Sequence, residues 1–235
     1  MTETTAAANR APKPGRGRQT SFRFRTWGGK RDGAGRKRIQ ARAGVPHLAR
    51  PSHDGRHPVH MTLRAKAGQP SLRGQRLFVE MRRALSRASR DGFRVLHFSV
   101  QRDHVHLLAE ARDKRSLSRG ARGLVIRAAR AINRVLDRAG PVWGDRYHAR
   151  PLRTPREVRH ALVYVLSNWK KHGPSRAEFD TRSSAWWFPG WSRPPSLDAS
   201  GWRGPEPPVE PPQTWLARVG WRRHRLIAPT EVPRT

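Results

Sequence analysis

The stretch FRVLHFSVQRDHVHLLAEA, residues 93–111, decides the fold of this chain. Both of its halves are rich in apolar and β-forming residues, and the polar residues Arg102 and Asp103 between them form a predicted tight turn. We therefore expect two antiparallel strands joined as a hairpin. Because side chains alternate along a strand, one face of the first strand is expected to carry Leu96, Phe98 and Val100.

His104 and His106 lie two residues apart in the second strand of this hairpin. The alternation predicts that both imidazoles point to one side of the sheet, and that the opposite side carries Val105, Leu107 and Ala109. Two imidazoles on one face can bind one metal ion, but such pairs also occur in strands for structural reasons. The two histidines are therefore a candidate metal site that needs a further ligand.

The sequence on either side of the hairpin predicts the other elements of the fold. Strands are expected at 57–65 and 146–154, and helices within 71–92, 116–139 and 154–173. Gly140-Pro141 is expected to end the middle helix. The last helix has a predicted capping box, with Thr154 and Glu157 in position and Pro155 between them. The order β-α-β-β-α-β-α predicts an α+β fold, a ferredoxin-like antiparallel sheet with packed helices.

The charge balance indicates a polyanionic partner. Lys and Arg number 49 against 17 Asp and Glu, which gives a formal net charge of +32 in 235 residues. A chain this basic repels itself unless a polyanion neutralises it, so nucleic acid is the expected partner, and a membrane surface is the weaker alternative. The chain has no cysteine, no apolar run of membrane-spanning length and no apolar signal segment at its start. We therefore expect a cytoplasmic protein that acts on nucleic acid.

Composition divides the chain into three parts. Residues 1–56 are a predicted flexible basic arm, residues 57–174 a predicted catalytic domain, and residues 175–235 a Pro- and Trp-rich extension. Within the extension, PEPPVEPP is typical of a stiff linker. Its six tryptophans could pack the extension onto the domain, or they could stack on unpaired bases, and packing is the preferred interpretation.

The last predicted helix supplies candidates for the missing ligand and for a nucleophile. Its apolar stripe consists of Val158, Leu162, Val165, Leu166 and Trp169, and its polar stripe of Glu157, His160, Tyr164, Asn168 and Lys171. Tyr164 and Asn168 are one helical turn apart. If the polar stripe faces the histidines, the amide oxygen of Asn168 could be a third metal ligand beside the Tyr164 phenol. Tyr147 is the alternative tyrosine, but it has no such polar neighbour.

Two imidazole nitrogens and one oxygen, with open positions, suit Mn²⁺ or Mg²⁺ holding phosphate oxygens. A tyrosine beside such an ion can become a phenolate and attack a phosphodiester. This set of residues therefore predicts phosphodiester transesterification.

At this point the residues resemble a known family. HPVHMTLR, HVHLL after a short hairpin, a long Arg-rich helix, and VWGDRYHARPLRTPREVRHALVYVLSNWKKHG occur in the order found in single-tyrosine HUH transposases. Within that superfamily the chain is most similar to the bacterial REP-associated tyrosine transposases, over roughly residues 57–174. Those relatives commonly have Pro-Asn before the H-x-H motif, where this chain has Arg102-Asp103.

The resemblance implies the HUH endonuclease/transposase fold and specific residue roles. His104, His106 and Asn168 would bind the divalent metal. Tyr164 would be the catalytic nucleophile that forms a 5′-phosphotyrosine on single-stranded DNA beside imperfect palindromic hairpins. The implied protein is cytoplasmic and nucleoid-associated, a monomer or a homodimer.

Basic residues along the domain and extension are candidate DNA contacts: Arg64, Arg119, Arg122, Arg130, Arg134, Lys170, Lys171, Arg222 and Arg223. Two other functions stay open at this point. A domesticated, non-catalytic protein that binds hairpin DNA or RNA would use the same charge but not the four site residues together. A phosphoesterase that activates water would need more carboxylates than Glu110 near the histidines.

Overall fold

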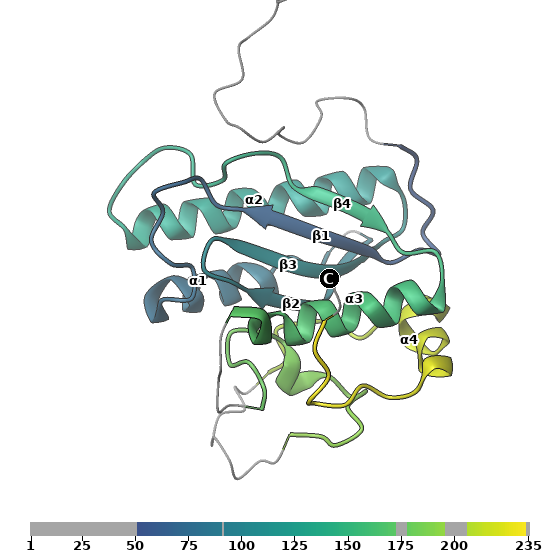
Figure 1. The fold of residues 1–235 in the computed structure, drawn as a ribbon. Coiled ribbons are helices and arrows are strands. Elements are labelled where there is room, and N and C mark those ends of the chain that lie inside the picture. Colours follow the sequence, from purple (N-terminus) through teal and green to yellow (C-terminus); the bar gives the residue numbers. More distant parts are fainter. Residues whose placement is uncertain (1–50, 91, 173–177, 196–205, 234–235) are drawn as a thin grey trace, which may run out of the picture. The chain divides into compact units, whose positions relative to one another are not determined.

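Four short strands form the centre of the fold. The computed structural model describes residues 51–90, 92–172, 178–195 and 206–233. Strands β1 (Val59–Arg64), β2 (Phe93–Val100), β3 (His104–Ala111) and β4 (His148–Pro151) make one antiparallel sheet in the order β2-β3-β1-β4, as Figure 1 shows. The predicted hairpin is therefore the β2–β3 pair, and β1 lies at the centre beside β3.

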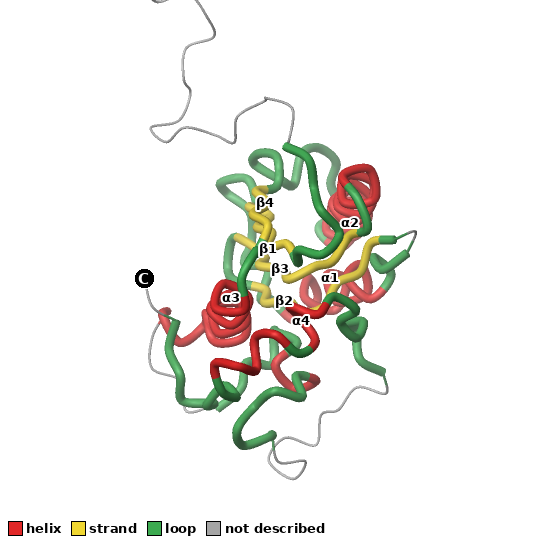
Figure 2. Tube along the Cα trace, turned by 90° about the vertical axis from the view of Figure 1, so that its right-hand side faces the viewer, coloured by secondary structure: helices red, strands yellow, loops and turns green. Residues whose placement is uncertain are grey.

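Helices cover both faces of the sheet. Helices α1 (Gln75–Ser86) and α2 (Lys114–Val135) lie on one face and α3 (Pro155–Ser167) on the other, as Figure 2 shows. The predicted order β-α-β-β-α-β-α and the α+β fold class are confirmed. Across the described segments, no helix has both the length and the apolar character needed to cross a membrane.

Two apolar cores form, one on each face of the sheet. The core beneath α1 and α2 includes Val59, Met61, Leu63, Val105, Leu107 and Ala109 from β1 and β3. The core beneath α3 contains Leu96 and Leu108 from the sheet and Val158, Leu162 and Leu166 from the helix. The alternation predicted for β3 is thus confirmed, and its histidines share a face with Leu108, on the α3 side.

The expected face of Leu96 is wrong. Leu96 lies in the core beneath α3, whereas Phe98 and Val100 lie in the core beneath α1 and α2. The cause is an irregularity in the β2–β3 register between Val95 and His97, which reverses the side-chain alternation there. The backbone of Val95 bonds outside the β2–β3 ladder, with its N–H donating to Ser89 Oγ and its carbonyl accepting from Glu210 N–H.

The boundaries of α2 also differ from the prediction. The helix begins at Lys114, because the Asp113 side chain accepts a hydrogen bond from the Ser116 N–H at 2.7 Å. It ends at Val135, four residues before the expected end. Asp137 has a φ of 46°, a left-handed conformation that breaks the helical hydrogen-bond pattern before Gly140.

The described parts of the C-terminal extension pack against the domain. Residues 182–184 lie along the edge of β2, where Val100 N–H donates to the Arg182 carbonyl and Ser184 N–H to the Phe98 carbonyl. Helix α4 (Trp215–Arg218) and the 3₁₀ turn Gly220–His224 pack on α3. Packing is confirmed for Trp191 and Trp221, which are buried in the core beneath α3. Trp202 lies outside the described residues.

The proline-rich segment before α4 is attached to the sheet. Glu110, which is 4% exposed, accepts hydrogen bonds from the backbone N–H groups of Gln213 and Thr214 and from the Thr214 hydroxyl. Arg94 also donates to the Pro211 carbonyl. These bonds fix the start of α4 at one end of β3.

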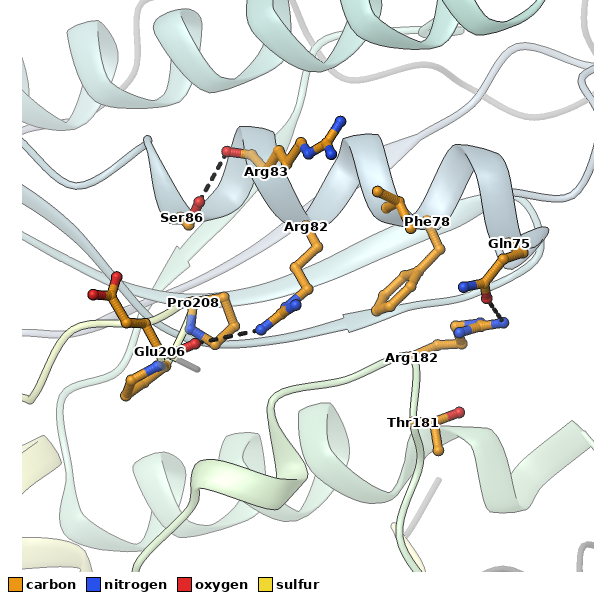
Figure 3. Close-up of a pocket in the computed structure, with 11 residues that line it drawn as sticks. Gln75, Phe78, Arg82, Arg83, Ser86, Thr181, Arg182, Glu206 and Pro208 are labelled. Carbon is orange, nitrogen blue, oxygen red and sulfur yellow. Dashed lines mark hydrogen bonds between the residues drawn. The ribbon is translucent and has the colours of Figure 1, made fainter. Parts of the chain in front are cut away.

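A cavity of about 650 Å³ lies between α1 and the extension, and Figure 3 shows the arginines that line it. Arg82 reaches from α1 to the backbone carbonyl of Glu206, and its guanidinium lies 5.2 Å from the centre of the Trp187 ring. Arg182 donates to Gln75 Oε1 and lies over the Phe78 ring at 4.7 Å. Both arginines therefore join the extension to α1.

We predict that Trp221→Ala lowers the free energy of unfolding by about 3–5 kcal/mol, since Trp221 is 2% exposed and its indole N–H donates to the Ala217 carbonyl. Urea unfolding measures the loss. Val219 lies two residues before Trp221 and is 48% exposed. Val219→Ala should therefore change the free energy of unfolding by less than about 0.5 kcal/mol. Equal effects of the two substitutions would contradict an integral role for this turn.

The buried His97 predicts a pH dependence of stability. Burial lowers the pKa of His97 from 6.5 to about 3, so the unfolded chain binds a proton at His97 between these pH values and the folded chain does not. The stabilisation that comes from keeping His97 neutral in the folded chain is therefore complete above pH 6.5 and is lost as the pH falls toward 3. The free energy of unfolding of His97→Gln should therefore fall less steeply than that of the wild type between pH 6.5 and 4. The exposed His160→Gln is the control and should retain the wild-type slope.

Candidate functional site

The pairing of β1 with β3 assembles a polar patch on the α3 face of the sheet. Thr62 lies opposite His106, and Arg64 lies opposite His104. Because directly opposite residues of antiparallel strands share a face, both pairs point toward the α3 side. The predicted common face of His104 and His106 is confirmed by their ring centroids, which are 4.6 Å apart.

Tyr164 of α3 contacts this histidine patch. The centroid of its ring lies 4.9 Å from that of His106 and 5.5 Å from that of His60, both in edge-to-face geometry. The capping box at Thr154 and Glu157, present as predicted, fixes where α3 begins and therefore where Tyr164 faces the sheet. The structure thus brings the predicted nucleophile together with the predicted histidines.

Tyr147 lies on the other side of the sheet. It packs at the border of the apolar core beneath α1 and α2. Of the two tyrosines in the chain, Tyr164 is therefore the one whose ring contacts His106.

Two neighbours orient the histidine rings. Nδ1 of His104 lies 2.7 Å from Asp103 Oδ1, and Nδ1 of His106 lies 3.2 Å from Thr62 Oγ1. These contacts leave Nε2 as the remaining nitrogen of each ring. Hydrogen bonding of one imidazole nitrogen to a carboxylate or hydroxyl is the usual support for a metal-binding histidine. Asp103 and Thr62 are thus residues of the candidate site that the sequence did not identify. The sequence did place Asp103 in the turn before His104.

Charge at the edge of the site is set by Asp103. Burial opposes ionisation of its carboxyl, but the hydrogen bond to His104 and the nearby charges of His104 and Arg64 outweigh burial and lower its pKa. Arg64 lies 3.5 Å from Asp103. A carboxylate is therefore present beside His104 at neutral pH, where it favours a tautomer with the proton on Nδ1 and a lone pair on Nε2.

His60 of β1 adds a third imidazole on this face. Its ring centroid is 5.3 Å from that of His106, and its buried Nε2 has no hydrogen-bond partner among the described residues. Burial, together with the charges of His148 and Arg150, lowers its pKa to about 4. His60 is therefore neutral at physiological pH and can accept a hydrogen bond at this site.

Asn168 caps the C-terminal end of α3. It is 2% exposed and lies one turn beyond Tyr164, where the helix tightens into the 3₁₀ turn Asn168–His172. Its role as a third ligand stays a prediction. In the described ranges, no three His, Cys, Asp or Glu side chains are grouped to hold a metal. Glu110 is already bonded to Gln213 and Thr214.

A cavity of about 560 Å³ opens beside the tyrosine. It is bordered by the β4 edge of the sheet, by α3 and by the end of the chain, and its lining includes His60, Tyr164, Arg150, Arg159 and Glu231. Arg159 donates to both carboxylate oxygens of Glu231, at 2.7 and 2.9 Å. The cavity gives the phenol a polar approach from outside the sheet.

The candidate DNA-binding residues fall into separate groups. Arg64 is exposed beside the histidines. Helix α2, which covers the opposite face of the sheet, carries four exposed candidates: Arg119, Arg122, Arg130 and Arg134. Lys170 donates to the Pro229 carbonyl, and the side chain of Lys171 lies outside the described residues. Arg222 and Arg223 are exposed over the rings of Trp221 and Trp215.

Two comparisons with known proteins gave matches to this chain. Residues 56–166 match the family model described as "Transposase IS200 like". The solved structures that match include the "Structure of the REP associates tyrosine transposase bound to a REP hairpin". That match has 19% sequence identity and a TM-score of 0.44, and it covers 55% of this chain and 75% of the other. No curated protein matches the chain.

Proposed function

We propose that the chain is a metal-dependent transposase that nicks and rejoins single-stranded DNA through a tyrosine nucleophile. The observation that carries the proposal is the contact of the Tyr164 ring with the ring of His106, on the face that also carries His104. The match of residues 56–166 to the IS200-like transposase model supports the reaction class. The formal charge of +32 supports a nucleic-acid substrate.

The residues at the site fit a divalent metal. His104 and His106 contact Asp103 and Thr62 through Nδ1, so Nε2 would be the ligand atom of each ring. The amide of Asn168 would add an oxygen ligand. Nitrogen and neutral oxygen ligands with open positions suit Mn²⁺ or Mg²⁺. When bound, the ion would withdraw negative charge from the scissile phosphate and favour the phenolate form of the nearby tyrosine.

The proposed reaction conserves the energy of the phosphodiester. Tyr164 Oη bonds to the phosphorus while the bond from phosphorus to the 3′ oxygen breaks, and the departing 3′ oxygen gains the proton that the phenol loses. The product is a 5′-phosphotyrosine and a free 3′-hydroxyl. Attack by another 3′-hydroxyl reverses the step, rejoins DNA and releases the tyrosine.

The DNA class follows from the resemblance to REP-associated tyrosine transposases. That resemblance implies an unpaired strand beside an imperfect palindromic hairpin, bound in the bacterial cytoplasm. Arg64, exposed next to Asp103, is the candidate phosphate contact nearest the histidines. Contacts of this kind fix the register of the DNA backbone.

We predict that Tyr164→Phe abolishes a covalent protein–DNA adduct, because it removes the attacking oxygen and leaves the ring contacts in place. A labelled single-stranded hairpin from the repeats flanking the gene, incubated with Mn²⁺, provides the assay, with the adduct detected on a denaturing gel. Hairpin binding should stay within about twofold of the wild type. Tyr147→Phe is the matched control and should form the adduct normally. An adduct with Tyr164→Phe would refute the assignment of the nucleophile.

Substitution of the histidines should remove metal-dependent cleavage. His104→Ala and His106→Ala are each expected to lower the Mn²⁺-supported rate about 100-fold or more, and Asp103→Asn about tenfold, because it weakens the support of His104. Calorimetric titration with Mn²⁺ should show the same order of affinity loss. His160→Ala, an exposed histidine on α3, is the control. Unchanged Mn²⁺ affinity in both alanine variants would exclude a metal at this patch.

A further inference from the structure

A cavity of about 830 Å³ lies at the end of β3 away from His104. Its lining comes from the segment before β1, the ends of β2 and β3, the connection between β4 and α3, and the start of α4. The lining includes Arg56, Arg94, Arg112, Arg153, Glu110 and Trp215. Four cationic side chains and an exposed aromatic ring in one hollow are the components of a site for an unpaired nucleotide.

Trp215 presents its ring to solvent. It is 49% exposed, whereas Trp191 and Trp221 of the same extension are buried. The edge of its six-membered ring lies over Gly220, where an added Cβ would come within 2.7 Å of Cζ3. Gly220 therefore allows the ring to lie flat beside the following turn. The Arg223 guanidinium lies 4.8 Å from the ring centroid, an arrangement that can add an Arg–base contact to stacking.

The ring is held in place by the sheet. Thr214 is the N-cap of α4, and its backbone N–H and hydroxyl both donate to Glu110 Oε1. Because Glu110 is buried on β3, these bonds fix α4 to the strand that carries the catalytic-site histidines. An exposed tryptophan anchored in this way loses little conformational entropy when a base stacks on it.

The charge of the cavity stays positive after its own ion pairs are counted. Arg56 pairs with Asp54, Arg112 lies 3.5 Å from Asp113, and Arg94 lies 3.9 Å from Glu110. Glu110 is also saturated by the hydrogen bonds to residues 213 and 214. Arg153 adds a further positive charge, and Arg223 lies over the ring of Trp215.

We infer that this cavity is a second DNA-contact site, in which an unpaired base of the single-stranded substrate stacks on Trp215 between the surrounding arginines. The inference rests on the proposed function for its substrate class. Glu110 lies on the same face of β3 as His106 and four residues away, or about 13 Å along the strand. A single strand bound here lies within a few nucleotides of Tyr164. A base within a duplex has no free face, so the site selects unpaired DNA.

The test compares two DNA probes by fluorescence anisotropy at fixed salt. One is a hairpin with an unpaired oligothymidine flank, and the other is the same hairpin with blunt ends. All variants are made with Tyr164→Phe, so that binding is measured without cleavage and the result does not depend on the proposed nucleophile. In this background, Trp215→Ala should weaken binding of the flanked hairpin about fivefold or more and leave binding of the blunt hairpin unchanged.

Three control variants keep this test decisive. Trp215→Phe retains an aromatic face and should recover most of the affinity for the flanked probe. Val219→Ala truncates a neighbouring exposed side chain, and Arg87→Gln removes an exposed charge outside the cavity. Neither substitution should alter the difference in affinity between the flanked and the blunt hairpin. The inference is overturned if Trp215→Ala prefers the flanked hairpin over the blunt hairpin as strongly as the wild type does. It is also overturned if a folded Trp215→Ala variant loses the same affinity for both hairpins. Failure of the proposed function would appear instead as no adduct in the otherwise wild-type chain.

Discussion

The register between β1 and β3 is the constraint on which the site depends. It places Thr62 against His106 and Arg64 against His104 on the face beneath α3. A slip of one residue in the pairing would move these side chains to the core beneath α1 and α2. The apolar residues Val59, Met61 and Leu63 oppose such a slip because each is buried in that core. The polar patch is therefore a consequence of apolar burial on the other face.

Helix α3 is held from two sides. Val158, Leu162 and Leu166 pack in one core with Leu108 of the sheet and with Trp221 of the extension. The extension is thus part of the support for the tyrosine, because displacement of Trp221 would free one side of the helix that carries Tyr164. The tryptophan-rich extension has two roles on this view: buried rings position the helix, and the exposed ring of Trp215 is available for a ligand.

Local patterns predicted most of the fold and the central residues of the site. Alternation in β1 and β3, and the capping box at Thr154, depend on neighbours in sequence, so the histidine face and the start of α3 were predictable. The reversed face of Leu96 was not, because it depends on Val95 bonding to Ser89 and to the distant Glu210. The Glu110–Thr214 bonds also join residues far apart in sequence. The hydrogen bond from His104 to Asp103 joins adjacent residues, but its geometry is not encoded in a periodic pattern.

The segment of residues 182–184 along β2 has a consequence for how the protein meets other chains. A sheet edge with free N–H and carbonyl groups is a template for pairing with a foreign strand. Here Val100 and Phe98 already bond to Arg182 and Ser184, so another chain would have to displace this segment to extend the sheet. The opposite edge is the four-residue β4, which ends in Pro151. Proline has no N–H to donate, so this edge is also a poor start for β-aggregation.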